Sequence, residues 1–345
     1  MNGESERVNE CGTEPAGLIA VILLSYRGLD DTLKCLESLR HVTDPKWRVY
    51  LVENGTQPSP VDAIRAAHDW IEIIRCEENG GWSGGNNVGI RRAMEDGAEH
   101  LLLLNNDTIV APNMLTRMRA ALAAHPDYGI LGPIICWMDE PTEVNTDGWV
   151  FNDPEGRGFF QRRSVPRQVT DPPTVVESEL VNGCAMLVRR TVFEQVGLID
   201  ERFFLIHEES EFCLRARHAG WRCGIISESL VWHKGSSAFA RDSRPLQRYF
   251  DARNLGLILQ THRGQSVLGG SPAKLRKQYW SHVYSMYEHE RSQGRLAGAD
   301  ATLSGAMDAM RGIGGPLLDR RRPLKWLLQL LFSLKFRMHP ASNSR

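Results

Sequence analysis

The sequence predicts an α/β fold in which helices cover both faces of a mostly parallel sheet. Apolar runs alternate with amphipathic segments over residues 18 to about 96, and this alternation is typical of strand-helix-strand units. Four leucines at 101–104 then end in two amides and a carboxylate, as a buried parallel strand does where it reaches a ligand site. With 345 residues, 42% of them apolar, the chain can bury a large core.

The individual elements follow from the local pattern. Residues 1–17 are polar and predict a flexible leader, and order is expected to begin with the apolar strand at 18–25. The segment 30–40 places Leu33, Leu36 and Leu39 on one helical face. By the same criteria we expect strands at 48–54, at 71–75 and over the leucines from 101, with Asp107 at the carboxyl end of the last, and helices at 61–70, at 87–96 and from about Pro112.

The stretch 137–180 differs in texture from everything before it. It is rich in Pro, Gly, Asp and Arg and has little periodicity. A long irregular segment inside a compact domain is more often a binding loop than a linker, and we interpret it as a binding loop.

Composition and charge exclude several classes of protein. The formal net charge of −1 gives no global field that would attract nucleic acid. The seven cysteines are scattered without a Cys-x-x-Cys pair, which predicts a reducing compartment and no zinc site. The acidic start does not resemble a secretory leader, and no run of about 20 apolar residues is present to span a bilayer. We therefore expect a cytoplasmic protein.

Polar residues at two strand ends are the first candidates for a ligand site. Asp107 follows the leucine strand, where open α/β sheets bind ligands; capping of the next helix is the alternative. Glu53 and Asn54 are suited to hydrogen bonding a base or ribose, or else form a tight turn. The glycines of NGGWSGGNNVG at 79–89 permit close approach to a phosphate at a helix start, although G-x-G-x-x-G spacing is absent.

Two later clusters add charged candidates. Glu208, Glu209 and Glu211 fall within four residues at a predicted helix start. Pairing with the helix dipole accounts for one or two of them, and a third beside His207 indicates a general base. His233 precedes Gly and Ser, a setting for a metal ligand, a phosphate contact or a structural histidine.

Taken in order, these segments resemble the inverting family-2 glycosyltransferases with the Rossmann-like GT-A fold, particularly a bacterial rhamnosyltransferase-like subgroup. The resemblance covers roughly residues 18–262. The segments that carry it are S-Y-R at 25–27, V-E-N-G-T at 52–56, the glycine-rich segment at 79–89, L-N-N-D at 104–107, G-x-x-M-L-x-R-R at 183–190, G-x-x-D-E-x-F-F at 197–204, E-E-S-E-F-C-L-R at 208–215 and R-N at 253–254.

The resemblance implies a domain layout and a reaction. A GT-A domain at 18–262, with a donor half at 18–136 and an acceptor half at 137–262, would be followed by a helical extension at 263–345. The donor would be a UDP- or dTDP-linked sugar, and the acceptor a glycan or lipid-linked molecule in cell-surface polysaccharide synthesis. Glu209 would be the base, with Glu208 as its rival, and Asp107 with His233 would hold Mg²⁺ or Mn²⁺.

The resemblance also implies which other side chains meet the substrates. Glu211 and Arg215 would contact the acceptor. The donor site would comprise Ser25, Tyr26, Glu53, Asn54, Gly81, Trp82, Gly85, Asn86, Asn87, Asn105, Asn106 and Asp107.

The chain departs from the family pattern at four charged positions. Arg27 stands where Asn is usual, and Glu53, Glu209 and Glu211 replace aspartates, which moves each carboxylate outward by one methylene. A catalytically silent sugar-nucleotide-binding protein is therefore one alternative. A nucleotidyltransferase is the other; it would show a basic, glycine-rich loop after the first strand, where this chain has SYRGLDD.

The C-terminal tail has an amphipathic pattern. From Arg320 the chain reads RRRPLKWLLQLLFSLKFRMHP, with Leu324, Leu327, Leu328, Leu331 and Leu334 at helical spacing and cations at both ends. Such a helix lies at an anionic membrane surface or packs on the core as a terminal helix. The lipid-linked acceptors of the family favour peripheral contact with the inner face of the membrane.

Overall fold

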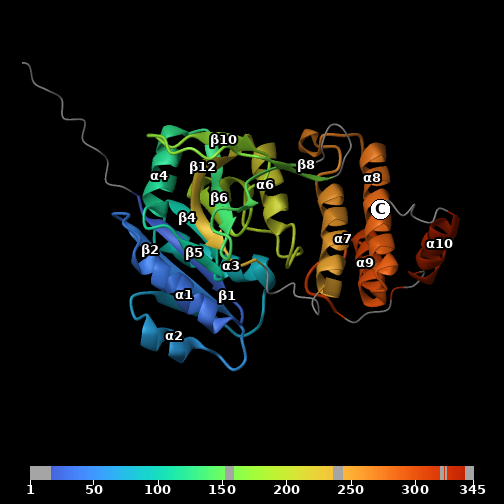
Figure 1. Cartoon of the computed structure of the whole chain (residues 1–345), viewed down its shortest axis with the longest axis horizontal. Helices are drawn as coiled ribbons and strands as arrows, with labels where there is room; N and C mark the ends of the chain where they lie inside the picture. Colours follow the sequence, from blue (N-terminus) through green and yellow to red (C-terminus); the bar gives the residue numbers. More distant parts are fainter. Residues whose placement is uncertain (1–16, 152–158, 236–243, 319–321, 323–324, 339–345) are drawn as a thin grey trace, which may run out of the picture.

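A ten-stranded mixed sheet organises the first two thirds of the chain, and a group of helices lies beside it (Figure 1). The computed structural model describes residues 17–151, 159–235, 244–318, 322 and 325–338. Most of the expected leader, residues 1–16, lies outside the described residues.

The first part of the sheet alternates strands with helices, as predicted. Parallel pairing joins β1 to β2 and to β4, and β2 to β3. The elements are β1 (Ile19–Ser25), α1 (Leu29–Arg40), β2 (Trp47–Asn54), α2 (Val61–Ala67), β3 (Glu72–Cys76), α3 (Gly81–Glu95), β4 (His100–Asn105), β5 (Thr108–Val110) and α4 (Met114–Ala124).

The second part adds antiparallel strands, so the sheet is mixed. Its order is β10-β12-β6-β11-β4-β1-β2-β3, with β5 on β12 and β7 on β6. The antiparallel strand β11 lies between β4 and β6. The elements are β6 (Tyr128–Trp137), β7 (Val144–Thr146), β8 (Gly148–Phe151), β9 (Phe160–Arg163), β10 (Val175–Ser178), β11 (Ala185–Arg189), α5 (Arg190–Val196), α6 (Glu208–His218) and β12 (Arg222–His233).

The predicted leucine strand ends at Asn105, just before a turn at Asn106 and Asp107, and the apolar residues after this turn form the separate strand β5. Two other local predictions are wrong. The segment 137–180, expected to be irregular, contains β7, β8, β9 and β10 among its described residues, because short strands in different sheets leave no single period to detect. Helix α3 begins at Gly81 rather than near Asn87, since its glycines hide a helix start from propensity.

The core lies on both faces of the sheet because successive strand residues point to opposite sides. In β1, Ile19, Val21 and Leu23 pack with α1, α2 and α4, whereas Ala20 and Ile22 pack with α3, α5 and α6. These strand residues are fully buried. The central strands therefore form a rigid support for the side chains at their carboxyl ends.

The helical part comprises α7 (Arg244–Thr261), α8 (Pro272–Ser292), α9 (Leu296–Met310) and α10 (Lys325–Met338). Helix α7 packs closely on α9: a Cβ at Gly256 would lie 2.6 Å from Ala309 Cβ, and one at Gly305 would lie 2.2 Å from Tyr249 O. Helix α10 lies outermost in Figure 1, and its Phe332 ring packs edge-on against Tyr284 and Tyr287 of α8. Helices α7, α8, α9 and α10 thus pack as one group.

The packing of α3 on the sheet generates a stability prediction. A Cβ at Gly89 would lie 2.5 Å from Ile22 Cγ2 and 3.0 Å from Val52 Cγ2. We expect Gly89→Ala to lower the free energy of unfolding by about 1–3 kcal/mol, since overpacking outweighs the gain in helix propensity. Urea denaturation of the purified variant measures this change.

Gly84→Ala is the matched control in the same helix. Its Cβ would meet nothing nearer than Glu201 Cδ at 3.9 Å. The variant should therefore be unchanged or more stable, by up to about 1 kcal/mol. Wild-type stability in Gly89→Ala would show that α3 does not pack this closely on β1 and β2.

Candidate active site

Parallel strands that end at one edge of the sheet bring several predicted donor residues together. Ser25 of β1 is paired with Glu53 of β2, and Leu24 is paired with Asn105 of β4. The Thr32 hydroxyl of α1 lies 3.0 Å from Ser25 Oγ and accepts from Asn106 Nδ2 at 2.8 Å. The neighbouring Tyr26 side chain is exposed. These residues form a continuous polar edge where an α/β sheet binds its ligand.

Glu53 and Asn54 are buried and hold the turn after β2. Glu53 Oε1 accepts from the Thr56 amide at 2.6 Å. The Asn54 side chain accepts from the Gly80 amide at 3.0 Å and donates to Gly81 O at 3.0 Å. Both side chains therefore stabilise the tight turn that was the alternative prediction. Their contact with a base or ribose stays a prediction.

The glycine-rich segment forms the first turns of α3. The amides of Trp82 and Ser83 donate to Phe204 O at 2.7 and 3.4 Å, so they are occupied, in contrast to the expectation of free N–H groups for an anion. A Cβ at Gly85 would lie 2.4 Å from Leu24 Cδ1, so this glycine permits close packing of α3 on β1. Asn86 donates to Trp82 O at 2.9 Å, and its Oδ1 is buried with no partner among the described residues.

The Trp82 side chain connects the strand ends to the acidic cluster. Its Nε1 donates to Asn105 Oδ1 at 3.1 Å. A Cβ at Gly183 would lie 2.9 Å from Trp82 Cζ2 and 3.3 Å from Glu209 Cβ. Gly183 thus allows the indole and the start of α6 to approach each other. Sequence reasoning did not give Gly183 this role.

Asp107 and His233 meet because β5 pairs with β12 in antiparallel register, with Thr108 opposite His233. The Nε2 atom of His233 lies 3.1 Å from Asp107 Oδ1. That nitrogen is buried and is close enough to Asp107 for an ion pair, although the angle between them is not that of a hydrogen bond. A carboxylate oxygen and an imidazole nitrogen side by side are a donor set that fits Mn²⁺ or Mg²⁺.

The charge of the pair is set by its surroundings. Burial alone would lower the pKa of His233, but Cys184 and Asp107 raise it to about 10. Burial also raises the pKa of the Cys184 thiol, which lies beside His233. The raised pKa favours the charged imidazole beside Asp107, and a metal bound to Nε2 would take the place of its proton.

Glu208 and Glu209 occupy different environments at the start of α6. The Glu208 side chain is buried, and its Oε2 has no hydrogen-bond partner among the described residues. Burial, with a smaller contribution from the charge of Glu209, raises the pKa of Glu208 well above its ordinary value. Glu209 is partly exposed and accepts from Ser210 Oγ at 3.3 Å. Burial therefore favours the protonated form of Glu208.

The turn that leads into these acids is strained. Phe204, Ile206 and His207 all have left-handed backbones, with φ of 61°, 69° and 68°. Each such residue costs about 1–3 kcal/mol and persists where the surrounding structure fixes it, which is common at active sites. Sequence reasoning missed this turn, because no glycine marks it.

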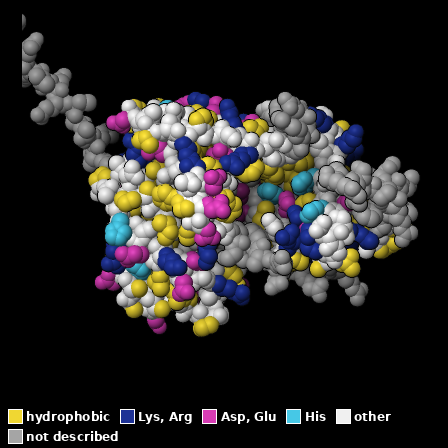
Figure 2. Space-filling model, in the orientation of Figure 1, with side chains coloured by type: hydrophobic (Ala, Val, Ile, Leu, Met, Phe, Trp, Pro, Cys, Tyr) yellow, Lys and Arg dark blue, Asp and Glu magenta, His cyan; other side chains and the backbone are white. Residues whose placement is uncertain are grey.

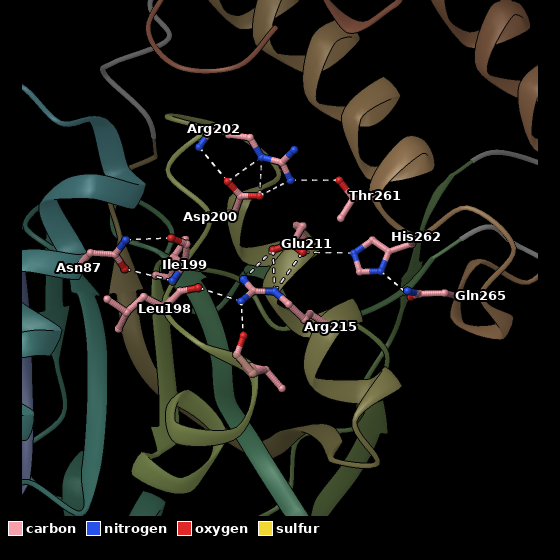
Figure 3. A network of polar contacts seen from close by, with 11 residues as sticks. Asn87, Leu198, Ile199, Asp200, Arg202, Glu211, Arg215, Thr261, His262 and Gln265 are labelled. Atoms are coloured by element: carbon pink, nitrogen blue, oxygen red, sulfur yellow. Dashed lines mark hydrogen bonds and ion pairs between the residues drawn. The ribbon is translucent and has the colours of Figure 1, made fainter. Parts of the chain in front are cut away.

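Glu211 and Arg215 belong to a buried polar network (Figure 3). Arg215 Nη2 lies 2.8 Å from Glu211 Oε2, and His262 Nε2 lies 3.3 Å from Glu211 Oε1. Burial would raise the pKa of Glu211, but His262 and Arg215 lower it below its ordinary value. The Glu211 carboxylate is thus fully engaged, and contact of these two residues with an acceptor stays a prediction.

The same network ties α3 to the segment before the strained turn. Asn87 Nδ2 donates to Ile199 O at 2.8 Å, and the Ile199 amide donates to Asn87 Oδ1 at 3.1 Å (Figure 3). Arg215 Nη1 donates to Leu198 O at 2.9 Å. Asn87 therefore holds α3 against the segment around Ile199. Its contact with a sugar-nucleotide donor also stays a prediction.

The described residues lack the patterns of a metal cluster with three or more side chains and of a membrane-spanning helix. Within it, no group of three or more His, Cys, Asp and Glu side chains is arranged to hold a metal ion. None of its helices combines the length and apolar character needed to cross a bilayer.

The mixed, mostly parallel sheet with helices on both faces and polar residues at its strand ends has the GT-A fold. Known structures support this fold assignment. The superposition on S. aureus TarS 1-349 in complex with UDP-GlcNAc has a TM-score of 0.56 at 16% identity and covers 92% of this chain and 89% of that one. For GalNAc-T7 with UDP, GalNAc and Mn²⁺ the TM-score is 0.54 at 15% identity, with coverage of 77% and 55%.

The chain belongs to glycosyl transferase family 2, whose sequence profile matches residues 20–197. It is 26% identical over 265 residues to the low-salt glycan biosynthesis hexosyltransferase Agl10 of Haloferax volcanii, covering 75% of this chain and 81% of that protein. It is 22% identical over 312 residues to the dTDP-rhamnosyl transferase RfbF of Shigella flexneri, covering 86% and 97%. The predicted family and its rhamnosyltransferase-like resemblance are confirmed.

Proposed function

We propose that this chain transfers a hexosyl or deoxyhexosyl group from a UDP- or dTDP-linked donor to a glycan or lipid-linked acceptor, with inversion at the anomeric carbon. The observation that carries the proposal is the Trp82 indole, which links Asn105 beside Asp107 to Gly183 beside Glu209. The likeness to a dTDP-rhamnosyl transferase and to a UDP-GlcNAc complex supports the donor class. Cell-surface polysaccharide synthesis is the proposed setting.

Asp107 and His233 are the residues that would hold Mg²⁺ or Mn²⁺. When bound, a divalent cation stabilises the negative charge of the departing nucleotide diphosphate. Because two protein ligands leave positions open on such a cation, the donor phosphates would complete the coordination. The proposed donor-binding residues remain those implied by the family motifs, from Ser25 through Asp107.

Glu209 is the proposed base. It would accept the proton of the acceptor hydroxyl as the hydroxyl oxygen forms the new bond to the anomeric carbon and the bond to the nucleotide diphosphate breaks. Glu208 is a poorer candidate, since it is buried and its raised pKa favours the protonated form, which cannot accept a proton. A partly exposed carboxylate also disfavours the silent-binder alternative, in which no base would be accessible.

The metal site generates the first functional prediction. Asp107→Asn should remove the Mn²⁺-dependent part of donor affinity, weakening binding at least about tenfold, because it deletes the anionic ligand. Isothermal titration calorimetry with UDP- and dTDP-linked sugars, in Mn²⁺ or in EDTA, measures the effect.

Asp31→Asn is the matched control for this variant. Asp31 pairs with Lys234, next to His233, at 2.9 Å and is not proposed as a ligand. Its variant should keep the Mn²⁺ dependence. An Asp107→Asn protein that binds donor as tightly as wild type in Mn²⁺, and less tightly in EDTA, would contradict the assignment.

The acidic pair generates the second functional prediction. Glu209→Gln should lower kcat by about 10²–10⁴-fold with little change in donor KM, because a general base acts in the transition state. Glu208→Gln imitates a protonated glutamate and should keep kcat within a few-fold. Steady-state assays of nucleotide diphosphate release test both. The opposite pattern would exchange the two roles.

We also propose that the tail reaches a membrane surface. Helix α10 docks through Phe332, yet Trp326, Leu327, Leu330 and Leu331 are exposed, at 64%, 38%, 47% and 55%. Two cations of the tail form ion pairs within the protein: Lys325 of α10 pairs with Asp300, and Arg322, which precedes α10, pairs with Asp308. Arg320, Arg321 and Leu324, and the side chains of Leu334, Lys335 and Arg337, lie outside the described residues. The proposed location is cytoplasmic, peripheral at the inner face.

Replacing exposed apolar residues tests the tail without removing its docking face. The double variant Trp326→Ser, Leu330→Ser should lose flotation with anionic vesicles while keeping its melting temperature and donor affinity, since shallow apolar insertion contributes to interfacial binding. Vesicles of neutral lipid serve as the control. Unchanged flotation of the double variant would exclude this face as the anchor.

A further inference from the structure

One face of α7 contacts the strained turn that precedes the acidic pair. The amide nitrogen of Asn254 lies 2.9, 2.8 and 2.6 Å from the carbonyl oxygens of Phe203, Leu205 and Ile206. Asn254 is fully buried. The two N–H groups of this one side-chain amide are therefore shared among three backbone carbonyls of the turn and of the residue before it.

The neighbouring α7 residues hold the same turn from other directions. Arg253 Nη2 donates to Arg202 O at 3.0 Å and to Phe203 O at 2.8 Å. Its Nε donates to Asn254 Oδ1 at 2.7 Å, which orients the amide. The Phe250 ring stacks on Phe204 with 5.6 Å between ring centroids.

Asp251 fixes the last residue before the acids. Its Oδ1 lies 2.9 Å from His207 Nε2. The His207 ring also stacks on the Phe160 ring of β9, with 4.5 Å between the ring centroids. His282 of α8 lies 3.8 Å from the same carboxylate oxygen. Histidine side chains gather in the hollow between the sheet and the helices on the face drawn in Figure 2. Burial would raise the pKa of Asp251, but these two histidines hold it below its ordinary value.

We propose that Asp251 and Asn254 are positioning residues for sugar transfer. They act by holding the left-handed turn at 204–207, which sets the direction in which Glu209 leaves the first turn of α6. The inference rests on the proposed role of Glu209 as base. The helical part of the chain thereby contributes to the active site without contacting the substrate.

Two features of the turn make this effect specific to catalysis. Its Phe204 carbonyl also accepts from the Trp82 amide at 2.7 Å, which anchors the start of the turn to α3, so loss of the Asp251 or Asn254 contacts displaces chiefly the end of the turn that leads into α6. A misplacement of a reacting group by about 1 Å costs about 100-fold in rate. The strand-end residues around Asp107 belong to other elements, so donor binding should change little.

The test compares Asp251→Ala and Asn254→Ala with the conservative variant Asp251→Asn. We expect the two alanine variants to lower kcat at least tenfold with donor KM within threefold of wild type. Asp251→Asn keeps an oxygen acceptor for His207 and should restore most of kcat. Asp251 is partly exposed, so its variants remain informative if Asn254→Ala does not fold. Wild-type kcat in folded Asp251→Ala, or an equal loss in Asp251→Asn, would overturn the proposal.

Tyr279→Phe is the matched control for a merely structural effect. Tyr279 donates to Ala252 O at 2.9 Å, in the same stretch of α7, and does not touch the turn. Its variant should lose stability but keep kcat. An equal loss of kcat in Tyr279→Phe would assign the effect to general stability and overturn the proposal.

A double-mutant cycle separates this inference from the proposed function. Asp251→Ala should add little to the loss in Glu209→Gln, because positioning acts through Glu209. Full additivity would show that Asp251 acts elsewhere. If Glu209→Gln leaves kcat unchanged, the assignment of the base is wrong; if Glu209→Gln lowers kcat and Asp251→Ala does not, the positioning role alone is wrong.

Discussion

The pairing of β5 with β12 is the constraint on which the rest of the site depends. It brings His233 within 3.1 Å of Asp107, although 126 positions separate them in the chain. The turn between β4 and β5 makes this pairing possible, because it ends the leucine strand at Asn105 and exposes Asp107 at the sheet edge. Parallel pairing of β1 with β2 and β4 then places the remaining polar residues beside that edge.

The acidic part of the site, at the start of α6, depends on packing between helices and strands rather than on strand register. Helix α6 starts from a turn with three left-handed residues, and contacts from α7 and β9 hold that turn in place. Trp82 contacts both parts of the site, since its indole donates to Asn105 at the strand ends and packs closely against Gly183 beside the start of α6. The helices α7 to α9 are thus part of the structural support for the site as well as an extension of the fold.

The sequence predicted those features that local pattern controls. Continuous apolar runs located β1, β2 and β4, and the strand-end position of Asp107 followed from them. The strained turn was not predictable, because its contacts come from residues about 50 positions away and no glycine marks it. Glu208 is buried and Glu209 is partly exposed because of how α6 packs in the folded protein. This difference could not be predicted from the sequence, in which the two residues are identical and adjacent. The early start of α3 was missed because glycines that serve close packing weaken its helical signal.

The central claim is that Asp107 and His233 share one divalent cation with a nucleotide diphosphate beside Trp82. A crystal grown with Mn²⁺ and UDP or dTDP, measured near the manganese absorption edge, tests it most directly. We expect an anomalous peak within about 2–2.6 Å of an Asp107 carboxylate oxygen and of His233 Nε2. A peak at another place, or a nucleotide bound away from the carboxyl ends of β1, β2 and β4, would contradict it.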